Sequence, residues 1–101
     1  MAAKKLAPVH PGNILLHDFM EPLNLSAYRV AKDLAVSAPT VNQIVRGERS
    51  VTAEMAVKLG HYFRTSSQMW MNLQTQYELE VVGKKLASEV EKLARAPEAA
   101  A

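Results

Sequence analysis

The chain has 101 residues, enough for one small domain, and 49% of them are apolar, enough for one modest core but not for a deep catalytic cleft. It contains no cysteine, which excludes disulfides and thiolate metal sites. No apolar run approaches the length of a membrane-spanning helix, and Lys4 and Lys5 are not followed by an apolar segment of signal-peptide length. We therefore expect a soluble cytoplasmic protein.

The formal net charge is only +2, but it is unevenly distributed. Residues 26–64 carry six basic and three acidic side chains, whereas residues 1–25 are balanced and residues 65–101 have one acidic side chain in excess. A positive excess in the middle of the chain favours a polyanionic partner such as nucleic acid.

The first predicted helix follows residues 1–9, which we expect to form a flexible arm. A His-Pro-Gly-Asn sequence at 10–13 opens a helix over about 12–21, where apolar residues recur at helical spacing. Pro22 ends this helix because proline lacks an amide hydrogen and disfavours the helical conformation of the preceding residue. We expect Leu23, in the following linker, to cover the core.

Two short helices joined by a tight corner are predicted between residues 26 and 46. The first spans about 27–34 and the second about 38–46, and Ser26 and Ser37 are suited to cap their starts. Each helix has a thin apolar edge that would lock the corner: Val30, Ala31, Leu34, Val36, Val41 and Ile44. Because the remaining face of the second helix is polar, the pattern predicts a helix-turn-helix.

Further helices are predicted after this pair. One spans about 53–63, capped by Thr52, and the next begins at Thr65 or Ser66. We expect Gly83 to interrupt that helix, and the spacing of Leu86, Val90 and Leu93 then indicates a sixth helix.

The predicted fold class is all-α, because no strand-like alternation, internal repeat or long linker appears. We expect a five-helix DNA-binding domain with a short C-terminal helical extension. The predicted boundaries are an arm at 1–9, a helix-turn-helix domain at 10–80, a helical extension at 81–95 and a disordered tail at 96–101.

The second helix of the pair offers the side chains that reading a major groove requires. Gln43 is the best candidate for a direct base contact, since its amide can pair with N6 and N7 of adenine. Thr40 can offer its hydroxyl to a base or its methyl to thymine, and Asn42 can reach a base or a phosphate. Ala38 and Pro39 can make close apolar contacts at the helix start. For Thr40 and Asn42 a merely solvated helix face is the alternative.

Basic and hydroxyl side chains around this helix are candidate phosphate contacts, which set affinity and register rather than sequence preference. They are Ser26, Tyr28, Arg29, Lys32, Ser37, Arg46, Arg49 and Ser50. The N-termini of both helices can also direct backbone amides at phosphates. For Arg29 and Lys32 an ordinary solvated charge is the alternative.

A series of short tracts runs through residues 10–79. They are His10-Pro11-Gly12, Pro22-Leu23-Asn24-Leu25-Ser26, Val41-Asn42-Gln43-Ile44-Val45-Arg46-Gly47, Val51-Thr52-Ala53, Thr65-Ser66, Trp70-Met71-Asn72-Leu73-Gln74 and Tyr77-Glu78-Leu79. With these tracts the chain resembles HigA-type antitoxins, also called virulence-associated protein I, of the Xre/lambda-repressor-like helix-turn-helix superfamily. The first tract and the last two are the specific marks, whereas the helix-turn-helix alone indicates only the superfamily.

The resemblance implies a lambda-repressor-like domain that forms a homodimer, binds operator DNA at its own promoter and neutralises a HigB/RelE-like toxin, a ribosome-dependent mRNA endonuclease. The two recognition helices of such a dimer would lie about 34 Å apart, one turn of DNA. The predicted dimer surface lies on the helix after residue 65 and consists of Trp70, Leu73, Tyr77 and Val81. Trp70 could instead pack in the core of its own protomer.

An enzyme is not expected, and neither is a cofactor. His10, His17 and His61 are far apart and have no paired carboxylates at ligand spacing, which argues against a metal site. The sequence shows no glycine-rich phosphate loop and no activated nucleophile.

Three interpretations remain open. The chain is an antitoxin that binds DNA and toxin, a solitary repressor of the same fold, or an interaction module whose helix-turn-helix no longer binds DNA. The polar face of the second helix argues against the third interpretation. The first two differ only in whether a toxin gene lies beside this one.

Overall fold

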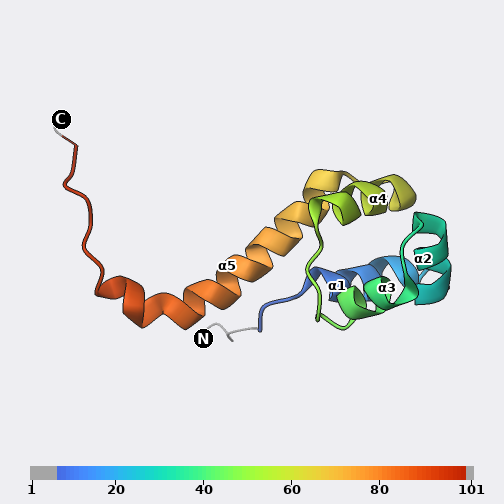
Figure 1. The fold of residues 1–101 in the computed structure, drawn as a ribbon, viewed down its shortest axis with the longest axis horizontal. Coiled ribbons are helices and arrows are strands. Elements are labelled where there is room, and N and C mark those ends of the chain that lie inside the picture. Colours follow the sequence, from blue (N-terminus) through green and yellow to red (C-terminus); the bar gives the residue numbers. More distant parts are fainter. Residues whose placement is uncertain (1–6, 100–101) are drawn as a thin grey trace, which may run out of the picture.

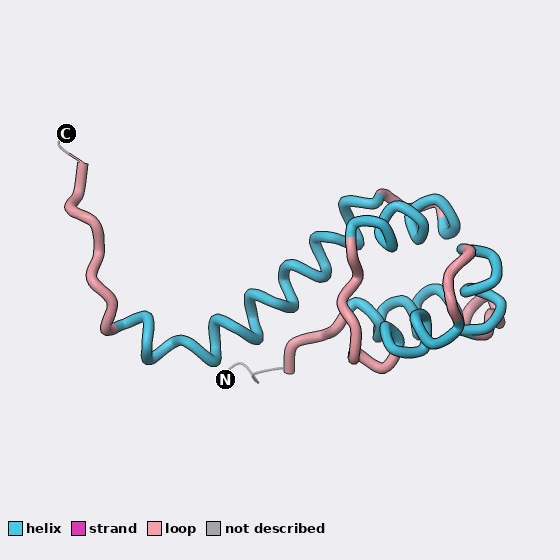
Figure 2. The backbone as a smooth tube through the Cα atoms, viewed as in Figure 1, coloured by secondary structure: helices cyan, strands magenta, loops and turns pink. Residues whose placement is uncertain are grey.

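The computed structural model of the chain describes residues 7–99, and every regular element in this range is helical (Figure 1, Figure 2). The elements are α1 (Pro11–Ile14), η1 (Leu15–Met20), α2 (Ala27–Leu34), α3 (Ala38–Val45), α4 (Ala53–Phe63) and α5 (Ser67–Glu91). The predicted all-α class is confirmed. The predicted arm and tail lie partly outside the described residues, at 1–6 and 100–101.

The starts of four helices are fixed by the side chains predicted to cap them. The hydroxyl oxygens of Ser26, Ser37, Thr52 and Ser66 each accept a hydrogen bond from the backbone N–H three residues further on. Each cap satisfies an amide that has no partner inside its helix and is worth about 1 kcal/mol. Local sequence therefore determines where these helices begin.

The start of the first helix is docked on the end of α3. His10 caps α1 through Nδ1, which accepts a hydrogen bond of 2.9 Å from the Gly12 amide. A Cβ atom at Gly12 would lie 1.7 Å from the Ile44 carbonyl oxygen, so only glycine permits this approach. The His-Pro-Gly tract is thus a structural joint between the N-terminal segment and α3.

The segment after α1 continues as the wider π-type helix η1. At its end the backbone N–H of Glu21 donates a hydrogen bond of 2.9 Å to the carbonyl oxygen of Leu16, five residues back. The predicted helix over about 12–21 is therefore present, and its second part is of the wider π type. Leu23 is 62% exposed, so it does not cover the core as expected, because the turn after η1 directs it outward before the left-handed Asn24.

The corner between α2 and α3 turns at Ala35, which has a left-handed conformation with φ of 58°. The Val36 amide donates to the Ala31 carbonyl at 2.9 Å, which closes the end of α2. A non-glycine residue in this conformation costs about 1 kcal/mol. The corner is consequently a strained point held in place by the packing on either side.

One core connects the helices, and its largest member is Trp70. The buried apolar residues are Leu15, Met20, Val30, Ala31, Leu34, Val41, Ile44, Val51, Met55, Ala56, Leu59 and Trp70. The Trp70 ring lies 5.2 Å from that of Phe19, and its Nε1 donates to the Thr65 hydroxyl at 2.8 Å. Trp70 has no exposed surface, so its assignment to a dimer interface is wrong; it packs in its own protomer.

The last helix, α5, continues through Gly83 and has 25 residues. The predicted interruption and separate sixth helix are therefore wrong: Leu86 and Val90 belong to α5, and Leu93 lies just beyond its end. One glycine costs a helix only about 1 kcal/mol, which is not enough to break so long an element. The predicted boundary between residues 80 and 81 falls inside this helix.

The first half of α5 packs against α4, whereas its second half projects away from the other helices (Figure 1, Figure 2). The Cα radius of gyration is 17.5 Å, compared with about 13 Å for a compact domain of this length. The molecule thus consists of a helical body and a projecting helical arm, which we define as residues 79–91.

Candidate nucleic-acid interface

The α3 helix has one buried edge and one solvent-facing edge. Val41 and Ile44 are fully buried and fix its position in the body. Pro39 and Asn42 are exposed, and the remaining predicted base contacts, Ala38, Thr40 and Gln43, are half-buried. The structure therefore brings all five predicted residues together on one helix. Their contacts with bases stay a prediction.

The N-terminus of α3 holds a pair of hydroxyl groups. Ser37 accepts the Thr40 amide at 3.3 Å, and the two side-chain oxygens lie 2.7 Å apart. One of the two hydroxyl protons is used in this contact. The remaining oxygen lone pairs and the free amides of the first turn lie at the positive end of the helix, which favours an anion such as phosphate.

Gln43 is held by Arg49, which lies in the loop after α3. Arg49 Nε donates to the amide oxygen of Gln43 at 2.8 Å. This bond orients the amide, and it leaves the Gln43 nitrogen free to donate. The oxygen retains a second lone pair, so a contact with the adenine amino group is compatible with the bond to Arg49.

Two polar groups of α2 and one of α4 form a hydrogen-bonded chain. Asp33 accepts a hydrogen bond from Arg29 Nε at 2.8 Å and another from the Tyr62 hydroxyl of α4. These two hydrogen bonds lower the pKa of Asp33 below its usual value, and the bond from Tyr62 has the larger effect. The carboxylate in turn raises the pKa of Tyr62. Arg29 is thereby fixed in direction, while its terminal nitrogens remain available to a phosphate.

The other predicted phosphate contacts surround α3. Ser26, Tyr28 and Lys32 are exposed on or before α2, and Tyr28 has 71% of its surface exposed. Arg46, at the end of α3, is 3.4 Å from Glu48, a pair that reduces the net charge of this loop. All these contacts stay predictions.

Sequence reasoning missed two residues that hold the loop after α3 against α5. The buried Gln74 accepts the Val51 amide at 2.7 Å and donates to Glu78 at 2.8 Å. Glu78 also lies 3.4 Å from the Ser50 hydroxyl. The available signal was the position of Gln74, four residues after Trp70 on a stripe otherwise made of apolar side chains.

His10 meets α5 at the point where this helix leaves the body. Its ring makes an edge contact with Tyr77, with centroids 4.8 Å apart, and lies against Gly47. Burial lowers the pKa of His10, and a contact with the Arg49 carbonyl partly offsets this. Tyr77 and Leu73, predicted for the dimer surface, are therefore half-buried inside the protomer, whereas Val81 is 39% exposed.

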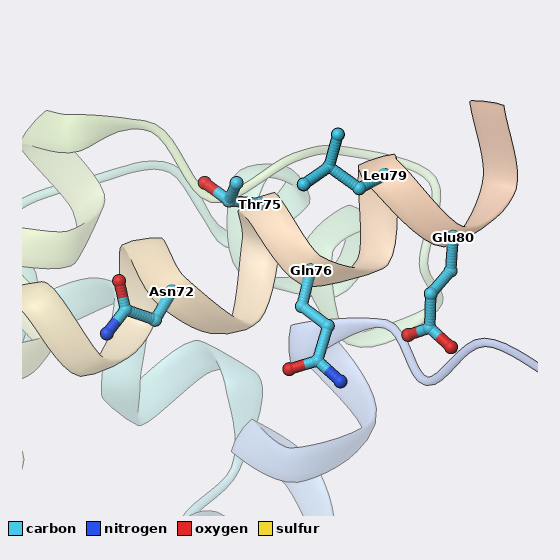
Figure 3. A pocket seen from close by; sticks show the side chains of 5 residues that line it. All are labelled: Asn72, Thr75, Gln76, Leu79 and Glu80. Atoms are coloured by element: carbon cyan, nitrogen blue, oxygen red, sulfur yellow. The ribbon is translucent and has the colours of Figure 1, made fainter. Parts of the chain in front are cut away.

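A second surface lies on the outward side of α5. Asn72, Thr75, Gln76, Leu79 and Glu80 line a shallow depression there (Figure 3). All five residues come from one helix, so this depression has no opposing wall. Apolar side chains continue along the arm, with Leu79 68%, Val82 48% and Val90 54% exposed. Such a surface suits another polypeptide better than a small molecule.

The structure of residues 7–99 offers neither a metal site nor a membrane-spanning helix. This range holds no group of three His, Cys, Asp or Glu side chains able to bind a metal ion. None of its helices combines the length and apolar character needed to cross a membrane.

A helix-turn-helix family model matches residues 16–70 of the chain. Virulence-associated protein I of Dichelobacter nodosus is 42% identical over 77 residues, which cover 76% of this chain and 71% of that protein. The chain belongs to the helix-turn-helix family that includes virulence-associated protein I.

Solved structures of HigA proteins agree with this assignment. The Pseudomonas aeruginosa antitoxin HigA, solved with the higBA promoter, has a TM-score of 0.85 and 44% identity, over 87% of this chain and 96% of that one. A HigA-family addiction module antidote protein from Coxiella burnetii has a TM-score of 0.85 and 35% identity, over 91% of this chain and all of that one. The HigA resemblance seen in the sequence is confirmed.

Proposed function

We propose that this protein is the antitoxin of a toxin–antitoxin module, represses its own operon by binding operator DNA, and neutralises a HigB/RelE-like toxin. The observation that carries this proposal is the α3 helix, whose apolar edge is locked in the body while its amide and hydroxyl edge faces solvent. This is the arrangement that reading a major groove requires. The HigA structure solved with promoter DNA supports it.

Base reading is assigned to Gln43, with Thr40 and Asn42 beside it. We expect Gln43→Ala to weaken operator binding by about 1–3 kcal/mol, because one bidentate contact is lost. Fluorescence anisotropy on a duplex from the region upstream of the gene measures this change. Gln68→Ala is the matched control, since Gln68 is exposed on α5 and bonds only to Asn72 within its helix. Equal operator affinity for both variants would sink the assignment.

A homodimer is proposed because one domain reads only half of a two-fold symmetric operator. The proposed contact between copies is the exposed apolar face of the arm, with Leu79, Val82 and Val90. Val81, two residues after Leu79, lies on the other side of the helix. Burial of such a surface supplies about 25 cal/mol per Å² of apolar area. This surface replaces the predicted dimer surface of Trp70, Leu73, Tyr77 and Val81, of which Trp70 is buried and Leu73 and Tyr77 are half-buried in the protomer.

Toxin binding is proposed from family membership. Co-purification of this protein with the product of the adjacent gene tests it, and a stable complex that protects messenger RNA from cleavage is expected. The alternative is a solitary repressor of the same fold, and it predicts operator binding with no partner in the neighbouring gene. Neither role requires catalysis by this chain, and both act in the cytoplasm, where the DNA and ribosomes lie.

A further inference from the structure

The loop after α3 carries three of the proposed phosphate contacts, Arg46, Arg49 and Ser50, and its residues 46–50 are exposed, whereas Val51 is buried. Its first residues are held by α3 itself, since the Gly47 amide donates to the Ile44 carbonyl at 2.9 Å and the Glu48 amide to the Gln43 carbonyl at 2.8 Å. At its other end the Val51 side chain is buried in the core, and the Val51 amide is bound by a side chain 23 residues away, Gln74 of α5. The ring of His10 also lies against Gly47 of the loop.

Gln74 is 3% exposed and is the one buried polar side chain among the described residues. Its oxygen accepts the Val51 amide at 2.7 Å, and its nitrogen donates to Glu78 at 2.8 Å. A flipped amide would set its nitrogen against the Val51 N–H, so the two partners fix a single orientation. Glu78 also approaches the Ser50 hydroxyl at 3.4 Å, which extends the contact to a second loop residue.

We propose that Gln74 is a positioning residue for DNA binding: with Glu78 it ties the loop of Arg46, Arg49 and Ser50 to α5. The proposal rests on the proposed operator binding. In this proposal the segment Trp70–Glu78 of α5 has two roles. It packs against the core, and through Gln74 and Glu78 it fixes the loop that carries the proposed phosphate contacts. The operator affinity thereby depends on a helix that carries none of the proposed DNA contacts.

The test uses the full-length protein and an operator duplex. Gln74→Met keeps the volume but leaves the Val51 amide unpaired, so the loop loses its fixed position. We expect about tenfold weaker operator binding and a slope of log affinity against log salt that is shallower by about two units, as if two phosphate contacts were lost. Gln68→Met is the matched control and keeps the wild-type affinity and slope.

The double variant Gln74→Glu/Glu78→Gln serves as the rescue. The exchanged carboxylate accepts the Val51 amide, the exchanged amide donates back to it, and the net charge is unchanged. We expect it to restore the affinity and salt slope lost in Gln74→Glu alone, where two carboxylates face each other. It also keeps the proposal testable if Gln74→Met does not fold.

Hydrogen exchange tests the clamp, by which we mean the hydrogen bond between Gln74 and the Val51 amide, independently of operator binding. We expect the Val51 amide to exchange faster in Gln74→Met while amides of the core helices remain protected. Unchanged Val51 protection, or an unchanged salt slope in folded Gln74→Met, overturns the proposal. Failure of the rescue variant to recover affinity also overturns it. If wild-type protein binds no operator, the proposed function fails instead, and the exchange result still decides whether the clamp exists.

Discussion

The two halves of α5 share one continuous helix but are held by different forces. The first half buries Trp70 and Gln74 and packs against α4, so tertiary contacts stabilise it. In the second half almost every residue is exposed, and Gly83 has no neighbouring atom within 4 Å of an added Cβ. Helicity there depends on local propensity alone unless another chain covers it. The comparison shows that a continuous helix need not be a continuous unit of stability.

The largest expected effect is in the buried half. Trp70→Ala should lower the free energy of unfolding by about 3–5 kcal/mol, because it removes the largest core side chain and leaves a cavity. Chemical denaturation followed by circular dichroism measures this. Leu79→Ala, on the same helix beyond the core, should change the value by less than about 0.5 kcal/mol. Similar losses for both would contradict the division of α5 into two halves.

A smaller change in free energy is expected for the association of two copies. Leu79→Glu should weaken the proposed dimer by about 2 kcal/mol or more, since each copy would bury a charge in the contact. Light scattering and sedimentation at micromolar concentration measure the mass. The matched control is Leu23→Glu, because Leu23 is equally exposed but lies in the turn after η1. A wild-type monomer, or a dimer unaffected by Leu79→Glu, would remove the arm as the interface.

The third effect concerns Gly83. Gly83→Ala should stabilise the arm by about 1 kcal/mol, because alanine loses less backbone entropy in a helix and the added methyl meets no neighbouring atom. Slower amide exchange in residues 79–91, with no change in the core amides, is the expected result. A change spread evenly over the molecule would mean that the arm and the body unfold together.

The smallest effect lies at the junction of the two halves, where His10 contacts Tyr77. Burial lowers the pKa of His10, so the unfolded chain binds the proton more readily than the folded one. The free energy of unfolding should then be flat above about pH 6.5 and fall as the pH decreases below it. His10→Asn, which keeps a capping oxygen, should reduce this dependence. Denaturation at pH 5.5 and 7.5 compares this variant with the wild-type protein.

Short-range features of this chain are predictable from sequence. The caps at Ser26, Ser37, Thr52 and Ser66 and the apolar edges of α2 and α3 follow from residues within one or two turns. They were sufficient to place the helix-turn-helix and its solvent-facing side chains.

The features that sequence reasoning missed depend on contacts between distant segments. The approach of Gly12 to Ile44 and the bond from Val51 to Gln74 exist only in the folded chain. Trp70 illustrates the same limit, because an apolar stripe does not tell whether its own protomer or a partner covers it. Gly83 shows the opposite limit, since its low helix propensity predicts a break, whereas α5 continues through it.

In the proposed dimer, contacts along the arm set the register of the two copies. Leu79 and Leu86 are spaced seven residues apart on the arm, and one such repeat measures about 10 Å along a helix. Charged residues lie between them, so a shift of a second copy by one or two residues would bury a charge. The register along the arm would thereby fix the separation of the two α3 helices, and with it the spacing of the operator half-sites.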